Sequence, residues 1–186
     1  MADQQVFSIA QVRDLSEGGV FWGKFVATSI TQKLDKNQKP YWDVAVMDGD
    51  GTLEAKVWSN SEWYDRRVEE EEPRRVDPSQ DAFFSRISGC TVGVQGKVSS
   101  YNGRPQYTFS KVYLLNQEKN PPHAYVRKSP IPFADLERRF RELVDRAEEP
   151  VKGFLQHVFR EERWEKFSTY PAATSHHHAY VHGLLE

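Results

Sequence analysis

The stretch YWDVAVMDGDGTLEAKVW, residues 41–58, consists of two alternating runs joined by a turn signal. In both runs every second residue is apolar, which is the period of a strand with one buried face. The tetrad DGDG (48–51) between the runs favours a tight turn, so the stretch predicts a β-hairpin. The residues expected to face the core are Trp42, Val44, Val46, Leu53, Ala55 and Val57.

Three further runs on either side of the hairpin also predict strands: 19–30, 91–98 and 106–115. Five strands with a longer insertion between the third and the fourth match the OB-fold, a small Greek-key β-barrel. The glycines at 93 and 96 are expected where the fourth strand bends to close the barrel.

The insertion, residues 59–89, is less regular. SEWYDRRV (61–68) is interpreted as a helix, and the charge run EEEEPRR (69–75) as a solvated loop.

Past residue 130 the apolar spacing changes from the period of strands to that of helices. The sequence predicts one helix over 133–147, a second beginning at Pro150 and a short third piece over 163–171. The expected organisation is therefore an OB-fold domain over 1–116, a proline-rich linker over 117–132 and a helical segment over 133–186.

Composition limits the function classes. The 186 residues carry a formal charge of -2, so a uniformly basic nucleic-acid binder is excluded and any polyanion site must be a local patch. No run approaches the ~18 apolar residues of a membrane span, and the first residues lack the pattern of a secretory signal. The lone Cys90 fits a reducing cytosol and is interpreted as a structural thiol.

Cations and aromatic residues gather where OB-folds bind nucleic acid, over strands 2 and 3 and the loops after strands 1 and 4. Cations suit phosphates and flat rings suit bases, which is what single-strand binding needs. Asp43 and Glu54 on the same face are expected to keep the affinity modest. The alternative is that the lysines are merely solubilising and that Trp58 packs under the insertion. The candidate nucleic-acid-binding residues are Lys33, Lys36, Lys39, Tyr41, Lys56, Trp58, Tyr101 and Arg104.

Four of the six histidines fall within residues 176–182. His178 and His182 stand four residues apart, a spacing that suits a metal pair on a helix. No third ligand accompanies them at a recognisable spacing, so the cluster is not a complete metal site.

Two stretches resemble one family, the YhaM-type 3′→5′ exoribonucleases, bacterial proteins with an OB-fold before an HD-type metal-dependent phosphohydrolase domain. Residues 41–58 resemble the hairpin of strands 2 and 3 in that OB-fold. FSTYPAATSHHHAYVHGLLE (167–186) is similar to the start of the HD domain, with its F-x-x-Y-P-A-A, His-His-Ala-aromatic and Gly-Gly-Leu patterns. His182 stands where the family has glycine. The matching positions are Phe167, Tyr170, Pro171, Ala172, Ala173, His177, His178, Ala179, Tyr180, Gly183 and Leu184.

The resemblance implies that the first metal-binding histidine of the HD domain would directly follow Glu186. The chain is then expected to hold an OB domain and the first helices of a truncated HD domain, with His177 and His178 near the site and no metal ligand of its own. In the full-length enzyme a divalent metal, Mn²⁺ by preference of the family, would activate water. The fragment is expected to bind and not to cut.

The expected partner is single-stranded RNA or DNA in the bacterial cytoplasm, with no membrane. Self-association through exposed helical faces is also expected. Two alternatives stay open: a stand-alone OB-fold binding module, and an HD phosphohydrolase that acts on nucleotides.

Overall fold

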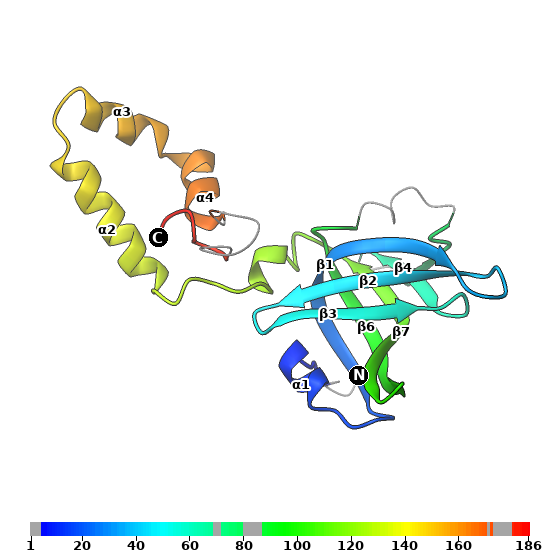
Figure 1. Ribbon diagram of the computed structural model, residues 1–186. Helices are drawn as coiled ribbons and strands as arrows, with labels where there is room; N and C mark the ends of the chain where they lie inside the picture. Colours follow the sequence, from blue (N-terminus) through cyan, green and yellow to red (C-terminus); the bar gives the residue numbers. More distant parts are fainter. Residues whose placement is uncertain (1–4, 69–71, 80–86, 171, 173–179) are drawn as a thin grey trace. The chain divides into compact units, whose positions relative to one another are not determined.

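The computed structural model describes residues 5–68, 72–79, 87–170, 172 and 180–186. The chain divides into two compact units, Met1–Val126 and Arg127–Glu186. The first is built mainly of strands, with the short helix α1 (Ile9–Arg13) beside them, and the second of helices (Figure 1).

The first unit is a closed barrel of five strands. Its elements are β1 (Val20–Leu34), β2 (Pro40–Asp48), β3 (Gly51–Val57), β6 (Thr91–Tyr101) and β7 (Arg104–Leu115). The sheet runs β3-β2-β1-β6-β7, and a parallel pairing of β3 with β7 joins its two edges. This strand order is that of an OB-fold, so the predicted fold class is confirmed.

The long strand β1 belongs to both halves of the barrel. Its residues 20–26 pair with β6, and its residues 26–34 pair with β2. A register shift between Ala27 and Ser29 marks an irregularity near the change of partner. Such bulges bend a strand and increase its twist, which lets one strand turn the corner of a small barrel.

The barrel core is formed by the alternating apolar residues of the five strands. All six residues predicted to face inward from the 41–58 hairpin are buried. A short helix that was not predicted from the sequence, α1 (Ile9–Arg13), adds Ile9 and Val12 to this core. Ser8 and Gln11 form its capping box. The backbone N–H of Ile9 donates to Asp48 Oδ2 at 2.7 Å, which ties α1 to the end of β2.

The two glycines of β6 make room for aromatic rings. A Cβ at Gly96 would lie 2.4 Å from the ring of Phe21, and one at Gly93 would lie 2.8 Å from the ring of Trp22. The pairing of β6 with β7 shifts register between Gln95 and Gly96. The unpaired residue at this shift is Ser110 of β7, so the bend expected in β6 stays a prediction, whereas a side chain at Gly96 would displace a core ring.

The helix predicted over 61–68 is wrong. Residues Glu62–Arg66 form strand β4, which pairs in parallel with β7, and Arg74–Val76 form β5, antiparallel to β4. Trp63 is buried, whereas Tyr64 stacks on Tyr113 on the outer side of the sheet. Trp63 and Tyr64 are consecutive aromatic residues whose side chains point to opposite faces of the sheet, as the two-residue period of a strand requires. Residues 69–71 of the charge run lie outside the described residues.

The second unit contains α2 (Phe133–Arg146), α3 (Val151–Val158) and α4 (Glu161–Thr169), close to the predicted helices. Phe140 packs its ring against those of Phe159, Trp164 and Phe167, with centroids 5.0–5.4 Å away. Leu143 and Phe154, in contrast, are 64% and 65% exposed.

The first part of the expected linker packs on the barrel unit. The side chain of Gln117 accepts from the backbone N–H of Thr91 and donates to the carbonyl oxygen of the same residue. Asn120 is buried and accepts from Lys24 Nζ and from the hydroxyl of Tyr125, which follows the short 3-10 helix η2 (Pro122–Ala124). No helix among the described residues is long and apolar enough to cross a membrane.

Candidate nucleic-acid interface

The outer face of β1, β2 and β3 carries a groove of about 570 Å³. The strand register places Thr31, Asp43 and Lys56 in one row across the three strands. In the next row the small side chains of Ser29 and Ala45 leave the space open. We call this surface the groove face.

Asp43 is the electrostatic centre of the groove face. Its two oxygens accept from Lys33 Nζ at 2.6 Å and from Lys56 Nζ at 2.7 Å. Partial burial raises the pKa of Asp43, but the hydrogen bonds from the two lysines outweigh burial and leave its pKa below the ordinary value. The same contact raises the pKa of Lys33. Asp43 and Lys33 are therefore charged at neutral pH, and the one carboxylate accepts hydrogen bonds from both lysine side chains.

Two rings extend the groove face at the end of the hairpin. The rings of Tyr41 and Trp58 lie with centroids 5.1 Å apart and planes tilted by 36°. Lys56 Nζ lies 4.8 Å from the centroid of Tyr41, a cation–π distance. Both rings are only half-buried, so each keeps exposed surface beside the lysine pair.

The structure thus gathers four of the eight predicted binding residues, Lys33, Tyr41, Lys56 and Trp58, into one cluster. Lys36 and Lys39 lie exposed in the loop between β1 and β2, where Asp35 accepts from the backbone N–H of Lys39. Tyr101 and Arg104 pair across the turn between β6 and β7, and Tyr101 is 67% exposed. These four residues are exposed but lie outside the cluster.

Residues that the sequence reading did not single out also line the groove. Arg13 comes from α1, and Gln106 and Tyr107 come from the start of β7. Arg13 donates to the carbonyl oxygen of Thr52, which holds its guanidinium at the groove. No local pattern points to Arg13, because its place depends on the docking of α1 against the hairpin. The position of Gln106 follows from the β3–β7 pairing that closes the barrel.

The described residues do not form a metal site. No group of three or more His, Cys, Asp or Glu side chains suited to a metal occurs in the described parts of the chain. His177 and His178 lie outside the described residues. The imidazole Nδ1 of His182 contacts the carbonyl oxygen of Ser168 at 2.5 Å, and its ring packs on Phe133. Its φ of 70° is in the left-handed region that favours glycine.

The described residues therefore do not match the ligand set of a hydrolytic metal centre, which needs about three protein ligands. Cys90 is partly buried beside the core, and burial raises the pKa of its thiol, as expected of a structural cysteine.

Comparison with known proteins finds sequence similarity to an exoribonuclease. No family model matches the chain. The 3′-5′ exoribonuclease YhaM of Halalkalibacterium halodurans is 27% identical over 164 residues, a match that covers 86% of this chain and 45% of that protein. The chain thus spans about half the length of this curated relative.

Solved OB-fold structures are more distant. The second OB-fold domain of replication protein A from Methanococcus maripaludis is 13% identical, with a TM-score of 0.33 over 59% of this chain and 94% of that domain. A replication protein A heterotrimer bound to single-stranded DNA is 18% identical, with a TM-score of 0.32 over 53% of this chain and 59% of that chain. The fold assignment rests on the strand order and barrel closure, and the chain is similar in sequence to an exoribonuclease.

Proposed function

We propose that the barrel unit binds single-stranded RNA and belongs to a 3′→5′ exoribonuclease. The observation that carries this proposal is the joint placement of Lys33 and Lys56 with Tyr41 and Trp58 on one open groove face. Ammonium groups neutralise phosphates, and exposed rings stack on bases without reading their sequence. The similarity to the YhaM exoribonuclease supports RNA as the ligand.

Binding would redistribute the ion pairs of Asp43. A phosphate that approaches the groove face competes with Asp43 for the two lysines, whose ammonium groups have three donors each. Lys56 sits between Asp43 and the ring of Tyr41, so it can contact a phosphate while a base stacks on the aromatic pair. The retained carboxylate keeps the affinity modest.

The nuclease activity of the whole protein is part of the proposal. The relative is about twice as long as this chain, and we place the remainder of the HD-type domain, with the ligands of its divalent metal (Mn²⁺ by family resemblance), in the part that this chain does not match. The described residues offer no such metal site, so no chemical step is assigned to them.

Fluorescence anisotropy with a labelled single-stranded oligo-A RNA tests the binding site. Replacing Lys33 and Lys56 by Ala should make the slope of the logarithm of the binding constant against the logarithm of the salt concentration flatter by up to about 1.4. Each phosphate contact on a single strand contributes about 0.7 to that slope. Trp58→Ala should weaken binding by roughly 1–3 kcal/mol and leave the slope nearly unchanged, because stacking releases no counterions.

The matched control replaces Arg139 and Arg146 in α2 by Ala, which removes two cations from the other unit. If the groove variants and this control all bind like the parent, the groove face is not the site. Tighter binding of mononucleotides than of oligo-A would favour the alternative of a phosphohydrolase that acts on nucleotides.

A separate assay addresses catalysis. This chain should leave a 5′-labelled RNA intact in the presence of Mn²⁺, while the full-length protein shortens it from the 3′ end. Degradation by the purified chain that is lost on replacing His177 and His178 by Ala would contradict the expectation.

A further inference from the structure

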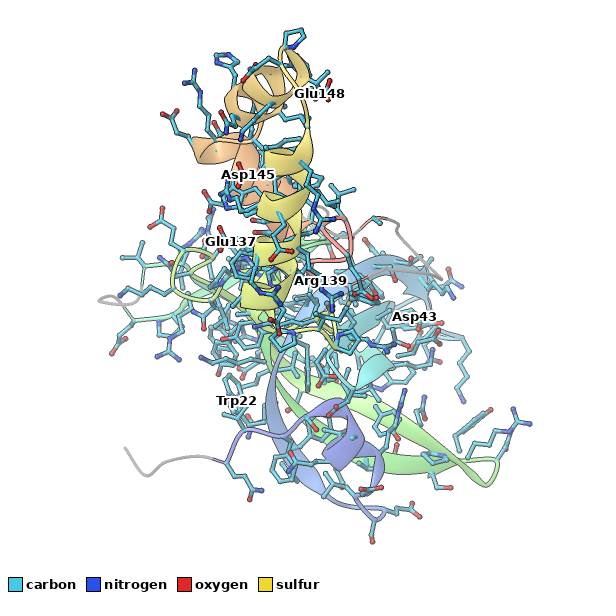
Figure 2. All side chains as sticks on the ribbon, turned by 90° about the vertical axis from the view of Figure 1, so that its left-hand side faces the viewer. Trp22, Asp43, Glu137, Arg139, Asp145 and Glu148 are labelled. Carbon is cyan, nitrogen blue, oxygen red and sulfur yellow. The ribbon has the colours of Figure 1, made fainter. Side chains whose placement is uncertain are left out.

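A second surface of the barrel also combines aromatic rings with cations. It is formed by those side chains of β1, β6, β7, β4 and β5 that point away from the barrel core. We call it the aromatic face. Figure 2 shows Trp22 of this face and Asp43 of the groove face on opposite sides of the barrel.

The aromatic face is organised by strand register. Lys24 pairs with Gly93, Gly93 with Tyr113, Tyr113 with Tyr64, and Tyr64 with Arg75, which sets one row across five strands. The neighbouring row carries Trp22, Gln95, Lys111 and Glu62. Because paired residues of a sheet point to the same side, both rows face outward together.

Three rings occupy the centre of the aromatic face. Tyr64 and Tyr113 are stacked, with centroids 4.9 Å apart and planes 12° from parallel. Trp22 meets Tyr113 edge-on at 5.5 Å and lies over Gly93, where a Cβ would be 2.8 Å from the indole. All three rings are half-buried, so the row is held in place yet keeps exposed surface.

The charge of the aromatic face is strongly positive. On the described strands its outward positions hold five cations and one carboxylate, in a chain whose formal charge is -2. Glu62 lies 3.4 Å from Lys111 and 3.8 Å from Arg75, so its single charge is shared by two cations. The groove face, in contrast, contains the carboxylates of Asp43 and Glu54, which offset the charge of its lysines. The cations are Lys24, Arg66, Arg75, Lys97 and Lys111.

We propose that the aromatic face is a second binding surface for single-stranded nucleic acid. Rings fixed beside clustered cations are the combination that single strands require, and the excess of positive charge selects a polyanion. A strand that occupies the groove face would continue around the barrel to this face. The inference rests on the proposed function for the class of ligand and for the path of a long strand, but either surface can bind if the other does not.

The test compares two RNA lengths, because one OB-fold covers about 4–16 nucleotides. Oligo-A strands of about 6 and about 30 nucleotides are titrated by anisotropy against the parent and against the double variant Lys97→Glu with Arg75→Glu. These two side chains are exposed, Arg75 by 68%, so their replacement spares the core. The control, Arg139→Glu with Arg146→Glu, makes the same change of net charge in the helical unit.

The expected result is a loss of affinity of at least tenfold for the longer strand and a salt slope flatter by about 1.4, with the control unchanged. The groove variant Lys33→Ala with Lys56→Ala should be the one that weakens the shorter strand. If the shorter strand instead responds only to the aromatic-face variant, the proposed groove site fails while this inference stands.

Equal binding of the longer strand by the parent and the aromatic-face variant overturns the inference, and points to an acidic protein as the partner of this surface. If the charge-reversed variant does not fold by circular dichroism, Lys97→Gln with Arg75→Gln replaces it. Cross-linking of 4-thiouridine RNA to the parent supplies a direct readout: adducts on peptides containing Trp22, Tyr64 or Tyr113 support the inference, and their absence beside groove adducts contradicts it.

Discussion

At the scale of single residues, Asp43 decides how much of the positive charge on the groove face is available to a ligand. It accepts hydrogen bonds from both Lys33 and Lys56, which a phosphate would have to replace. We expect Asp43→Asn to bind single-stranded RNA more tightly than the parent at low salt. The log–log salt slope should steepen by about 0.7 to 1.4, as one or two lysines become free for phosphates.

The matched control for Asp43→Asn is Glu165→Gln, which removes one carboxylate from an exposed position of α4. Anisotropy titrations at several salt concentrations make the comparison. Weaker binding by Asp43→Asn would mean that Asp43 orients the two lysines for the ligand and does not compete with it.

A second residue-scale prediction concerns Asp65, which is 11% exposed at the end of β4. Hydrogen bonds from the Arg67 side chain and backbone outweigh partial burial and lower the pKa of Asp65 to about 2. Because the folded pKa is below the unfolded value, the stabilisation is complete above about pH 4 and is lost as pH falls toward about 2.

Asp65→Asn should therefore lower the free energy of unfolding by on the order of 1–2 kcal/mol at neutral pH, after allowance for the exposed arginines. Urea unfolding of parent and variant from about pH 7 to about pH 2.5 measures the gap, which should narrow only in the acid range. A gap that is the same at both ends would show that the ionised form of Asp65 is not what stabilises β4.

At the scale of elements, β6 shows how a strand is shaped by the rings that cross it. Gly96 lies opposite Phe21 in the β1 pairing, and a methyl group there would enter the buried ring. We expect Gly96→Ala to destabilise the barrel by roughly 1–3 kcal/mol, the usual cost of overpacking a core. Gly49→Ala in the β2–β3 turn is the control, since a Cβ there meets no atom within 4 Å. Equal urea midpoints for the two variants would contradict this account of β6.

At the scale of the whole molecule, the helical unit leaves apolar side chains without cover. Leu143 and Phe154 are about two-thirds exposed, and Val151 is 53% exposed. Exposed apolar patches promote association, so the chain should self-associate as its concentration rises. Sedimentation velocity should show a weight-average mass that grows with concentration and returns to that of a monomer for Leu143→Gln with Phe154→Gln.

The control for that experiment is Val6→Gln with Val68→Gln, which removes two exposed apolar side chains from the barrel unit and should leave the association unchanged. A parent that stays monomeric over the accessible concentrations would contradict the prediction.

The alternation of residues 41–58 was sufficient to predict the hairpin and its inward residues, because the two-residue period is a local property of the chain. The barrel class followed from the number of such strands and the insertion between the third and the fourth. The same reasoning failed at Glu62–Arg66. Five residues of mixed pattern do not separate a strand from a helix, and β4 exists because β7 offers it an edge to pair with. The candidate lysines and rings were predictable as types on a face, but the sharing of Asp43 between Lys33 and Lys56 was not.

The aromatic face was the feature that could least be predicted without the tertiary structure. Trp22, Tyr64 and Tyr113 are separated by about forty residues or more along the chain and meet only because β1, β6, β7 and β4 are neighbours in the sheet. Periodicity states which way a side chain points from its own strand. Which strands lie side by side, and in what register, is set by barrel closure and the packing of the common core, so the composition of a surface that crosses several strands is decided only in the folded molecule.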